Sequence, residues 1–320
     1  MCDYQSGFVY QYENTTDITT KMDVVIILFS CCIIFMNPFI LFSVFQIYLS
    51  SPLVSFLIMI QITFDTLVCV SQIGNKFCPF LRITPQMWIN ILICHIWTNE
   101  FLNNLFNTFT KQSILAIIIE HCLSIYKPNV NLLNYPKLLG GIYCFSVAYN
   151  IVTNLYLILL VKIDQIGHCV INSNMLISSI DRLDLVIFGY VSLILGDIIP
   201  FIVMIIILIL VILHQYKRKV NVRDQAQIKP VQKYLTLLII VWCLPEILIT
   251  LLDMFQHVCE AYIEYEMICD ISHHCLEILR SITFMLHSIS LFIFLKPMRI
   301  EALKTFKNIL QFFKTTFHRN

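Results

Sequence analysis

Apolar segments of membrane-crossing length constrain the fold of this chain more than any other sequence feature. A transmembrane helix needs about 20 consecutive, mostly apolar residues. Seven segments meet this requirement, separated by charged or by Pro- and Asn-rich stretches. The expected spans lie at 23–49, 53–75, 88–125, 136–161, 184–215, 230–254 and 274–296. We therefore expect an all-α membrane protein, a seven-helix bundle over 23–296 with a tail at each end.

The composition agrees with a membrane protein and argues against several soluble classes. Hydrophobic residues make up 58% of the 320 positions and charged residues 13%, whereas soluble domains carry about 25% charged residues. The net charge of +1 provides no basic surface for nucleic acid, and only 7 glycines are present, too few to suggest Gly-rich phosphate loops. We expect membrane lipid around the chain, no nucleic-acid partner and no cofactor.

The distribution of Lys and Arg predicts the orientation. Fourteen basic residues fall in one set of loops, six fall in the other, and Lys111 lies inside the third expected span. Because Lys and Arg concentrate on the cytoplasmic side, the N-terminus is expected outside and the C-terminus inside. That arrangement requires an odd number of spans. The third segment is the least hydrophobic, and without it the count would be six.

The two tails carry different signals. Residues 1–22 are polar and lack the basic start of a cleavable signal peptide, so we expect an extracellular tail. The sequence Asn14-Thr15-Thr16 matches the glycosylation pattern and predicts modification at Asn14. Residues 297–320 alternate basic and apolar side chains, which indicates a cytoplasmic amphipathic helix on the membrane surface. An ordinary basic tail is the alternative.

The expected outer side is acidic. Thirteen Asp and Glu residues fall there against six Lys and Arg. Such a surface attracts cationic ligands and accelerates their encounter with the protein. The alternative is that the outer loops are acidic only because the inner loops are basic.

Thirteen cysteines are present, and several fall where an oxidising compartment would permit disulfides. Cys94 lies at the outer start of the third expected span and Cys169 in the loop before the fifth. A bridge between them would hold that loop over the bundle. Cys78 is an alternative to Cys94, because sequence alone does not fix connectivity.

Ionisable residues within expected spans are costly in lipid and therefore indicate function. They are Asp65, Glu100, Lys111, Asp197 and Glu246. On the third span, Glu100, Asn103 (or Asn104), Asn107 and Lys111 follow helical spacing and share one face.

One interpretation of this polar face is a pocket open to the outside, in which Glu100, Asn103, Asn107 and Glu246 bind ligand. The alternative is hydrogen bonding between helices. Lys111 requires an acidic partner, and Asp65 lies at comparable depth. We therefore predict a Lys111–Asp65 pair.

Motifs in this order resemble those of rhodopsin-like G-protein-coupled receptors over nearly the whole chain. They are Asn37, Asp65, Trp88 with Cys94, Glu120-His121-Cys122, Pro200, Trp242-Cys243-Leu244-Pro245 and Met298-Arg299. The resemblance implies a multi-pass plasma-membrane receptor that binds an extracellular ligand and signals to a heterotrimeric G protein.

The same resemblance implies roles for individual residues. Asp65 matches an aspartate that binds sodium in many family members, and Cys94 and Cys169 match the family disulfide. Residues 120–122 match the segment that contacts the G protein. Pro200 and Pro245 match the prolines that bend the fifth and sixth helices.

The chain also departs from the family pattern. His121 replaces the arginine of the coupling segment, and Ser290-Leu291-Phe292-Ile293-Phe294 replaces Asn-Pro-x-x-Tyr. The fourth span has no tryptophan, and two additional residues separate Cys94 from Glu120. A non-signalling homologue, acting as a decoy or as a partner of other receptors, is therefore an alternative.

The resemblance also bears on the ligand. Asn103 lies near the position where amine receptors carry an aspartate, which argues against an amine. The Tyr-rich acidic tail resembles that of chemokine receptors, with Cys2 and Cys269 as a second bridge, and favours a peptide or small basic protein. Divergent invertebrate receptors and viral receptor homologues show the same pattern.

Other classes have weaker support. Leu195-Gly196-Asp197 resembles part of the catalytic segment of intramembrane aspartyl proteases, with Asp65 as a second carboxylate, but the flanking motifs are missing. A transporter would show inverted repeats, and none is visible. A zinc site at His273 and His274 with Cys269 or Cys275 lacks a second cluster of ligands. We expect no enzymatic activity and no metal site.

Overall fold

The computed structural model describes the main helices of the chain and one short hairpin. The described residues are 17–46, 52–76, 88–89, 95, 101–126, 136–159, 161–163, 169–171, 191, 194–220, 230–262, 266–295, 299–300, 303–304 and 307. The expectations at Asn14, Glu100 and Cys94 lie outside these residues.

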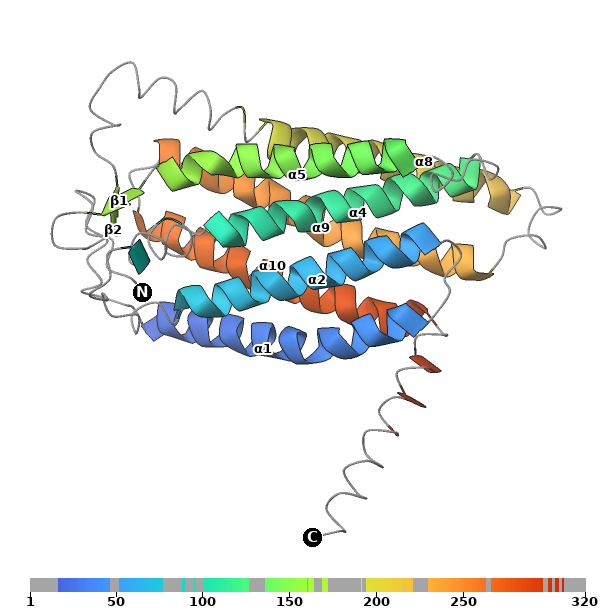
Figure 1. Cartoon of the computed structure of the whole chain (residues 1–320), viewed down its shortest axis with the longest axis horizontal. Coiled ribbons are helices and arrows are strands. Elements are labelled where there is room, and N and C mark those ends of the chain that lie inside the picture. Colours follow the sequence, from blue (N-terminus) through green and yellow to red (C-terminus); the bar gives the residue numbers. More distant parts are fainter. Residues whose placement is uncertain are drawn as a thin grey trace, which may run out of the picture.

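Long helices lie side by side and make up nearly all of the described structure (Figure 1). They are α1 (Asp17–Gln46), α2 (Pro52–Lys76), α4 (Phe101–Tyr126), α5 (Pro136–Leu159), α8 (Ile199–Val220), α9 (Pro230–Tyr262) and α10 (Glu266–Phe294). A five-residue π-helical turn, η4 (Ile194–Ile198), leads directly into α8. Strands β1 (Val161–Ile163) and β2 (Cys169–Ile171) form an antiparallel hairpin that pairs Val161 with Ile171.

Five described helical segments are long and apolar enough to cross a membrane, so the chain is a multi-pass membrane protein by the length and composition of its helices. They are Lys21–Gln46, Pro52–Gly74, Gly196–His214, Tyr234–Phe255 and Ser272–Phe294. The polar residues of α4 keep it outside this group despite its 26 residues. α4 is nevertheless long enough to span a membrane, and its polar residues pack against the other helices.

Six of the described helices form a closed ring in the order α1, α2, α4, α8, α9 and α10, and α5 packs against α4. α1 packs against α2 and α10, α9 packs against α8 and α10, and α4 contacts α2, α5, α8 and α9. The hairpin lies at the end where α1 and α10 begin, which we call the hairpin end (Figure 1). The opposite end, where α10 finishes at Phe294, is called the tail end.

Several helices extend beyond the expected spans, and α9 and α10 do so by the most residues. α9 continues to Tyr262 rather than 254, and α10 begins at Glu266 rather than 274. The expected boundaries followed the apolar stretch, whereas a helix keeps its hydrogen bonds beyond the hydrocarbon layer as long as its backbone allows.

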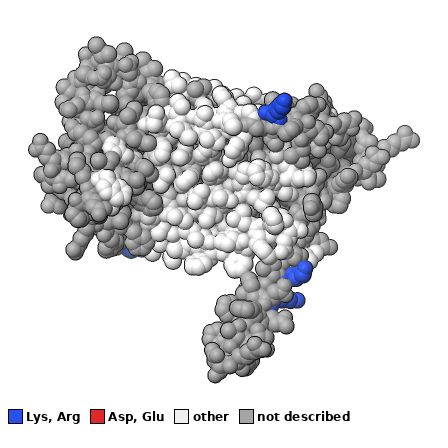
Figure 2. All heavy atoms as spheres, viewed as in Figure 1, with Lys and Arg blue, Asp and Glu red and all other residues white. Residues whose placement is uncertain are grey.

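The lateral surface of the bundle is apolar. Phe35 and Phe45 of α1 are 73% and 79% exposed, and Ile206 of α8 is 52% exposed. Figure 2 shows a surface without charged side chains between the two ends of the bundle, with the blue Lys and Arg side chains near the ends. Large apolar side chains on a broad exposed face are what lipid contact requires.

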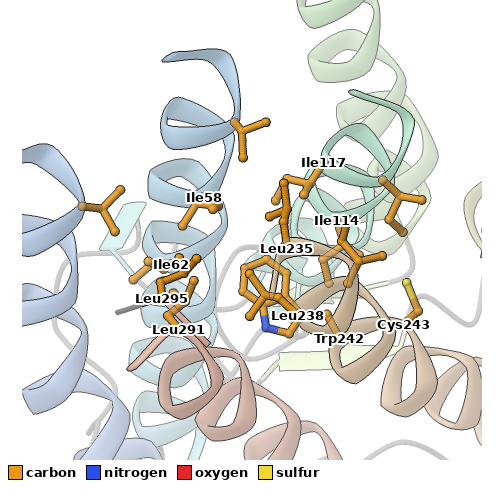
Figure 3. Packing of buried hydrophobic residues seen from close by; sticks show 14 of the residues in the cluster. Ile58, Ile62, Ile114, Ile117, Leu235, Leu238, Trp242, Cys243, Leu291 and Leu295 are labelled. Carbon is orange, nitrogen blue, oxygen red and sulfur yellow. The ribbon is translucent and has the colours of Figure 1, made fainter. Parts of the chain in front are cut away.

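The larger buried apolar cluster lies towards the tail end of the bundle, and Figure 3 shows part of its packing. It joins the end of α1, the start of α2, the second half of α4, the first half of α9, the end of α10 and two residues of α8, Met204 and Leu208. Its central members are Ile58, Ile62, Ile114, Ile117, Ile118, Leu235, Leu238, Trp242 and Leu291. Buried charges are concentrated in the other half. A smaller apolar cluster of Ile33, Val68, Cys69 and Phe284 lies outside this core. We call the end with the larger cluster the apolar half and the end with most of the buried charges the polar half.

Two neighbouring residues on α4 test which face of this helix points into the bundle. Ile118 is fully buried, whereas Ile119 is 36% exposed. We expect Ile118→Ala to lower the free energy of unfolding by about 2 to 4 kcal/mol, because the cavity cannot close. The matched variant Ile119→Ala should change it by less than about 0.5 kcal/mol. Thermal unfolding of the purified protein in detergent measures both, and equal effects would contradict the assigned orientation of α4.

Candidate functional site

The polar half of the bundle contains the candidate site, and Asp65 lies at its boundary with the apolar core. Asp65 is fully buried on α2. Its Oδ1 accepts hydrogen bonds from Gln61 Nε2 at 2.8 Å and Thr110 Oγ1 at 3.2 Å, and its Oδ2 lies 2.9 Å from His287 Nδ1. Ser113 of α4 also donates to Gln61. One carboxylate therefore connects α2, α4 and α10.

Trp242 of α9 extends this network. Its Nε1 donates to Ser290 Oγ at 2.7 Å, and its ring centroid lies 5.0 Å from that of His287. Ser290 in turn donates to the backbone carbonyl of His287 at 2.8 Å. Ser290 thus fixes the indole of α9 against α10.

Asn37 joins three helices a short distance away. Its Nδ2 donates to Thr66 Oγ1 at 2.8 Å and to the Ile62 carbonyl at 3.3 Å, while its Oδ1 accepts from Ser288 Oγ at 2.5 Å. Asn37 is fully buried. The side-chain amide therefore holds α1 against α2 and α10.

Lys111 is paired with two aspartates, and the predicted Lys111–Asp65 pair is wrong. Its Nζ lies 2.6 Å from Asp197 Oδ1 and 3.4 Å from Asp253 Oδ2. Arg280 Nη2 lies 2.5 Å from the other oxygen of Asp253. Consecutive residues on a helix point about 100° apart, so Thr110 faces Asp65 on α2 while Lys111 faces α8 and α9. Depth alone could not distinguish these directions.

The π-helical turn η4 positions Asp197. Pro200 follows the turn and has no backbone N–H, so it cannot donate to the turn before it. π-helical turns of this kind are frequent at functional sites. The sequence predicted a bend at Pro200, and the structure places the irregularity immediately before it. Pro245 lies inside α9, which remains one continuous helix.

Glu246 differs from the other buried charges. It is 1% exposed, and neither carboxylate oxygen has a hydrogen-bond partner among the described residues. It is within electrostatic range of His287, Lys111, Asp65 and Arg280. A buried carboxylate without hydrogen bonds is costly. Water or a cationic ligand that entered the bundle would supply the missing hydrogen bonds.

The predicted polar face of α4 is confirmed for its described members. Asn103, Asn107 and Lys111 are 2%, 6% and 4% exposed, and all lie inside the bundle. The Oδ1 of Asn103 has no hydrogen-bond partner in the described part of the chain. Like Glu246, it therefore has unused hydrogen-bonding capacity.

The residues predicted to contact a G protein lie at the tail end. His121 is fully buried, and its Nε2 is 2.9 Å from Thr236 Oγ1 on α9. Glu120 is 5% exposed and Cys122 is partly exposed. His121 thus connects α4 to α9 and is not presented on the surface.

The cysteine predictions are largely outside the described residues. Cys169 lies in β2, and the structure describes its backbone only. Within the described part, seven cysteines are free: Cys31, Cys32, Cys69, Cys122, Cys144, Cys243 and Cys275. The Cys94–Cys169 bridge stays a prediction.

Sequence reasoning missed Asp253, Arg280 and His287 as members of the interior network. Asp253 is one of the thirteen acidic residues and Arg280 one of the six basic residues assigned to the outer side, although both fall within expected spans. His287 also falls within a span. A stricter count of ionisable residues inside each span would have found all three, but not their partners. The two aspartates of the protease hypothesis, Asp65 and Asp197, bind different basic groups.

Comparison with known proteins assigns the chain to no family. No family model matches it, and no curated protein has significant sequence similarity to it.

The Lys111 cluster predicts a specific pattern of rescue. Lys111→Met leaves Asp197 without its cation, while Asp253 keeps Arg280, so we expect a loss of about 3 to 5 kcal/mol in unfolding free energy. Adding Asp197→Asn removes the uncompensated charge and should recover at least half of that loss. Adding Asp65→Asn to Lys111→Met should recover none, because Asp65 belongs to the other network. Rescue by Asp65→Asn in thermal unfolding would show that the assigned partners are wrong.

Proposed function

We propose that the chain is a divergent rhodopsin-like receptor of the plasma membrane with seven transmembrane helices, its N-terminus outside and its C-terminus in the cytoplasm. In this proposal α4 and α5 are the two further spans, and the hairpin end faces outward. The buried position of α4 supports its assignment, because neighbouring helices rather than lipid surround its polar residues. Successive long helices run in alternating directions between the hairpin end and the tail end (Figure 1). This alternation agrees with the orientation that the Lys and Arg distribution predicts.

The observation that carries the proposal is the division of the bundle into two halves, with two sets of hydrogen bonds where they meet. Asn37, Asp65, Trp242 and His287 connect α1, α2, α9 and α10 where the halves meet. A group that binds in the polar half and displaces one of these side chains would change the contacts of α9 in the apolar half. Such coupling between two ends of a bundle is what a transmembrane receptor needs.

In the proposed mechanism, ligand stabilises a conformation in which α9 has moved outward at the tail end. A ligand can shift this equilibrium only through different affinities for the two conformations. Pro245 removes one backbone hydrogen bond within α9 and lowers the cost of bending there. The hydrogen bond between His121 and Thr236 holds α9 against α4, so it has to break before a G protein can enter.

The ligand in this proposal is cationic, a peptide or a small basic protein. Glu246 supports this choice, because its buried carboxylate has no hydrogen-bond partner among the described residues and faces a polar interior. A Lys or Arg side chain of the ligand would supply both charge and hydrogen bonds. Asn103 and Asn107 on α4 add neutral polar contacts.

Glu246 makes the ligand assignment testable. We expect Glu246→Gln to leave unfolding free energy unchanged or raised, because a neutral amide is cheaper to bury. The same variant should lose at least about 10-fold in potency towards a basic peptide found by screening, since a charge-assisted hydrogen bond contributes about 1.5 to 3 kcal/mol. Cell-surface binding and G-protein activation measure this. Equal potency of wild type and variant would remove Glu246 from the ligand site.

The buried position of His121 also supports a second candidate, a non-signalling homologue. The family arginine in this position contacts the G protein, whereas His121 is fully buried and bonded to α9. A chain locked in this way would bind ligand without coupling.

Thr236→Val distinguishes these two candidates. Valine keeps the shape of threonine but cannot accept or donate the hydrogen bond to His121. For a coupling receptor we expect raised basal G-protein activation at equal surface expression. His121→Ala should have the same direction of effect. Thr63→Val serves as the control, because the hydroxyl of the exposed Thr63 donates to the Met59 carbonyl of its own helix, outside the network. Unchanged basal activity in both variants, together with saturable ligand binding, would favour the non-signalling homologue.

A further inference from the structure

Asp23, His274 and Glu277 come together at the hairpin end, where α1 and α10 begin. His274 Nδ1 lies 3.7 Å from Asp23 Oδ1 and 3.6 Å from Glu277 Oε2. One atom from each of the three side chains lies within 4.8 Å of the others. His274 and Glu277 are 5% and 4% exposed, and the Asp23 side chain is 18% exposed.

These distances are too long for hydrogen bonds but suit ligands of one small cation. Charge-assisted N–H to O hydrogen bonds measure about 2.7 to 2.9 Å. Two ligand atoms about 2.1 Å from a tetrahedral zinc ion lie about 3.4 Å apart. The two distances from His274 Nδ1 are a few tenths of an ångström longer than this, and the three ligand atoms lie within 4.8 Å of one another. Small side-chain movements would therefore bring all three ligands onto one ion.

The buried imidazole provides a second, independent observation. His274 Nδ1 points between the two carboxylates and has no hydrogen-bond partner among the described residues. A divalent cation placed between these side chains would bind the Nδ1 lone pair together with one oxygen of each carboxylate.

The donor set selects the kind of cation. Calcium and magnesium bind oxygen ligands almost exclusively, and calcium takes six to eight of them. An imidazole nitrogen instead suits transition metals, and zinc accepts both His nitrogen and Asp or Glu oxygen ligands. Three protein ligands leave the fourth tetrahedral position open for water or for an outside donor. The neighbouring His273, with its Nε2 3.9 Å from Glu277 Oε1, lies where a second layer of hydrogen bonding is usual.

We propose that Asp23, His274 and Glu277 bind one zinc ion, which joins α1 to α10 at the hairpin end. The sequence alone offered His273 and His274 with no second cluster of ligands, and in the structure a further ligand comes from Asp23 on the first helix. The site is independent of the proposed receptor function, because it requires only the packing of α1 against α10.

The test is zinc binding to the full-length chain, purified in detergent and stripped of metal. We expect one zinc ion per chain in competition with a chromogenic chelator, and Co²⁺ should give the visible absorption of a tetrahedral site. His274→Gln and Asp23→Asn should each weaken zinc binding by more than about 100-fold, since even second-layer partners contribute about 10- to 100-fold. Cys275→Ser, which removes a nearby exposed thiol, is the matched control and should bind zinc like wild type.

A thermal readout separates loss of metal from loss of fold. Zinc should raise the unfolding temperature of wild type and of Cys275→Ser, but not that of His274→Gln or Asp23→Asn. If a variant fails to fold without metal, Glu277→Gln replaces it. The proposal is overturned if wild type shows no stoichiometric binding below about 10 µM zinc, or if His274→Gln binds as wild type does.

Discussion

Charges buried inside a helix bundle must find partners there, and this requirement shapes the rest of the structure. Lys111 cannot reach water, so Asp197 and Asp253 surround its ammonium group, and Arg280 completes the charge balance. An unpaired charge in that position would cost several kcal/mol. Four helices are thereby held in one arrangement at the polar half, namely α4, α8, α9 and α10, counting η4 as the first turn of α8.

The polar and apolar halves have different mechanical roles. The apolar half is close-packed around Ile58, Ile117 and Leu238 and has little directional specificity. Hydrogen bonds and ion pairs in the polar half are directional, so they fix which face of each helix meets its neighbours. Asp65 and Trp242 lie where the two meet. A change in the polar half therefore has a physical route to the tail end through α9 and α10.

Glu246 and His274 stand out because the fold leaves them with unused bonding capacity. Lys111, Asp65 and Arg280 have ionic partners within 3 Å, whereas the carboxylates beside His274 Nδ1 lie 3.6 and 3.7 Å away. The carboxylate of Glu246 lies deep in the bundle, whereas the imidazole of His274 lies near its hairpin end. The first suits a cationic group from a ligand, and the second suits a metal ion. The bundle thus offers one position suited to a cationic ligand group and another suited to a metal ion.

The sequence by itself determined the helical, multi-pass architecture, because apolar length and the 3.6-residue spacing of Asn103, Asn107 and Lys111 are local properties of the chain. It also identified Asp65, Lys111 and Glu246 as special, since any ionisable residue in a span is costly. Only the tertiary structure decided the partners. Whether Lys111 meets Asp65 or Asp197, and whether Asp23 meets His274, depends on the rotation and neighbours of each helix, which hydropathy does not encode.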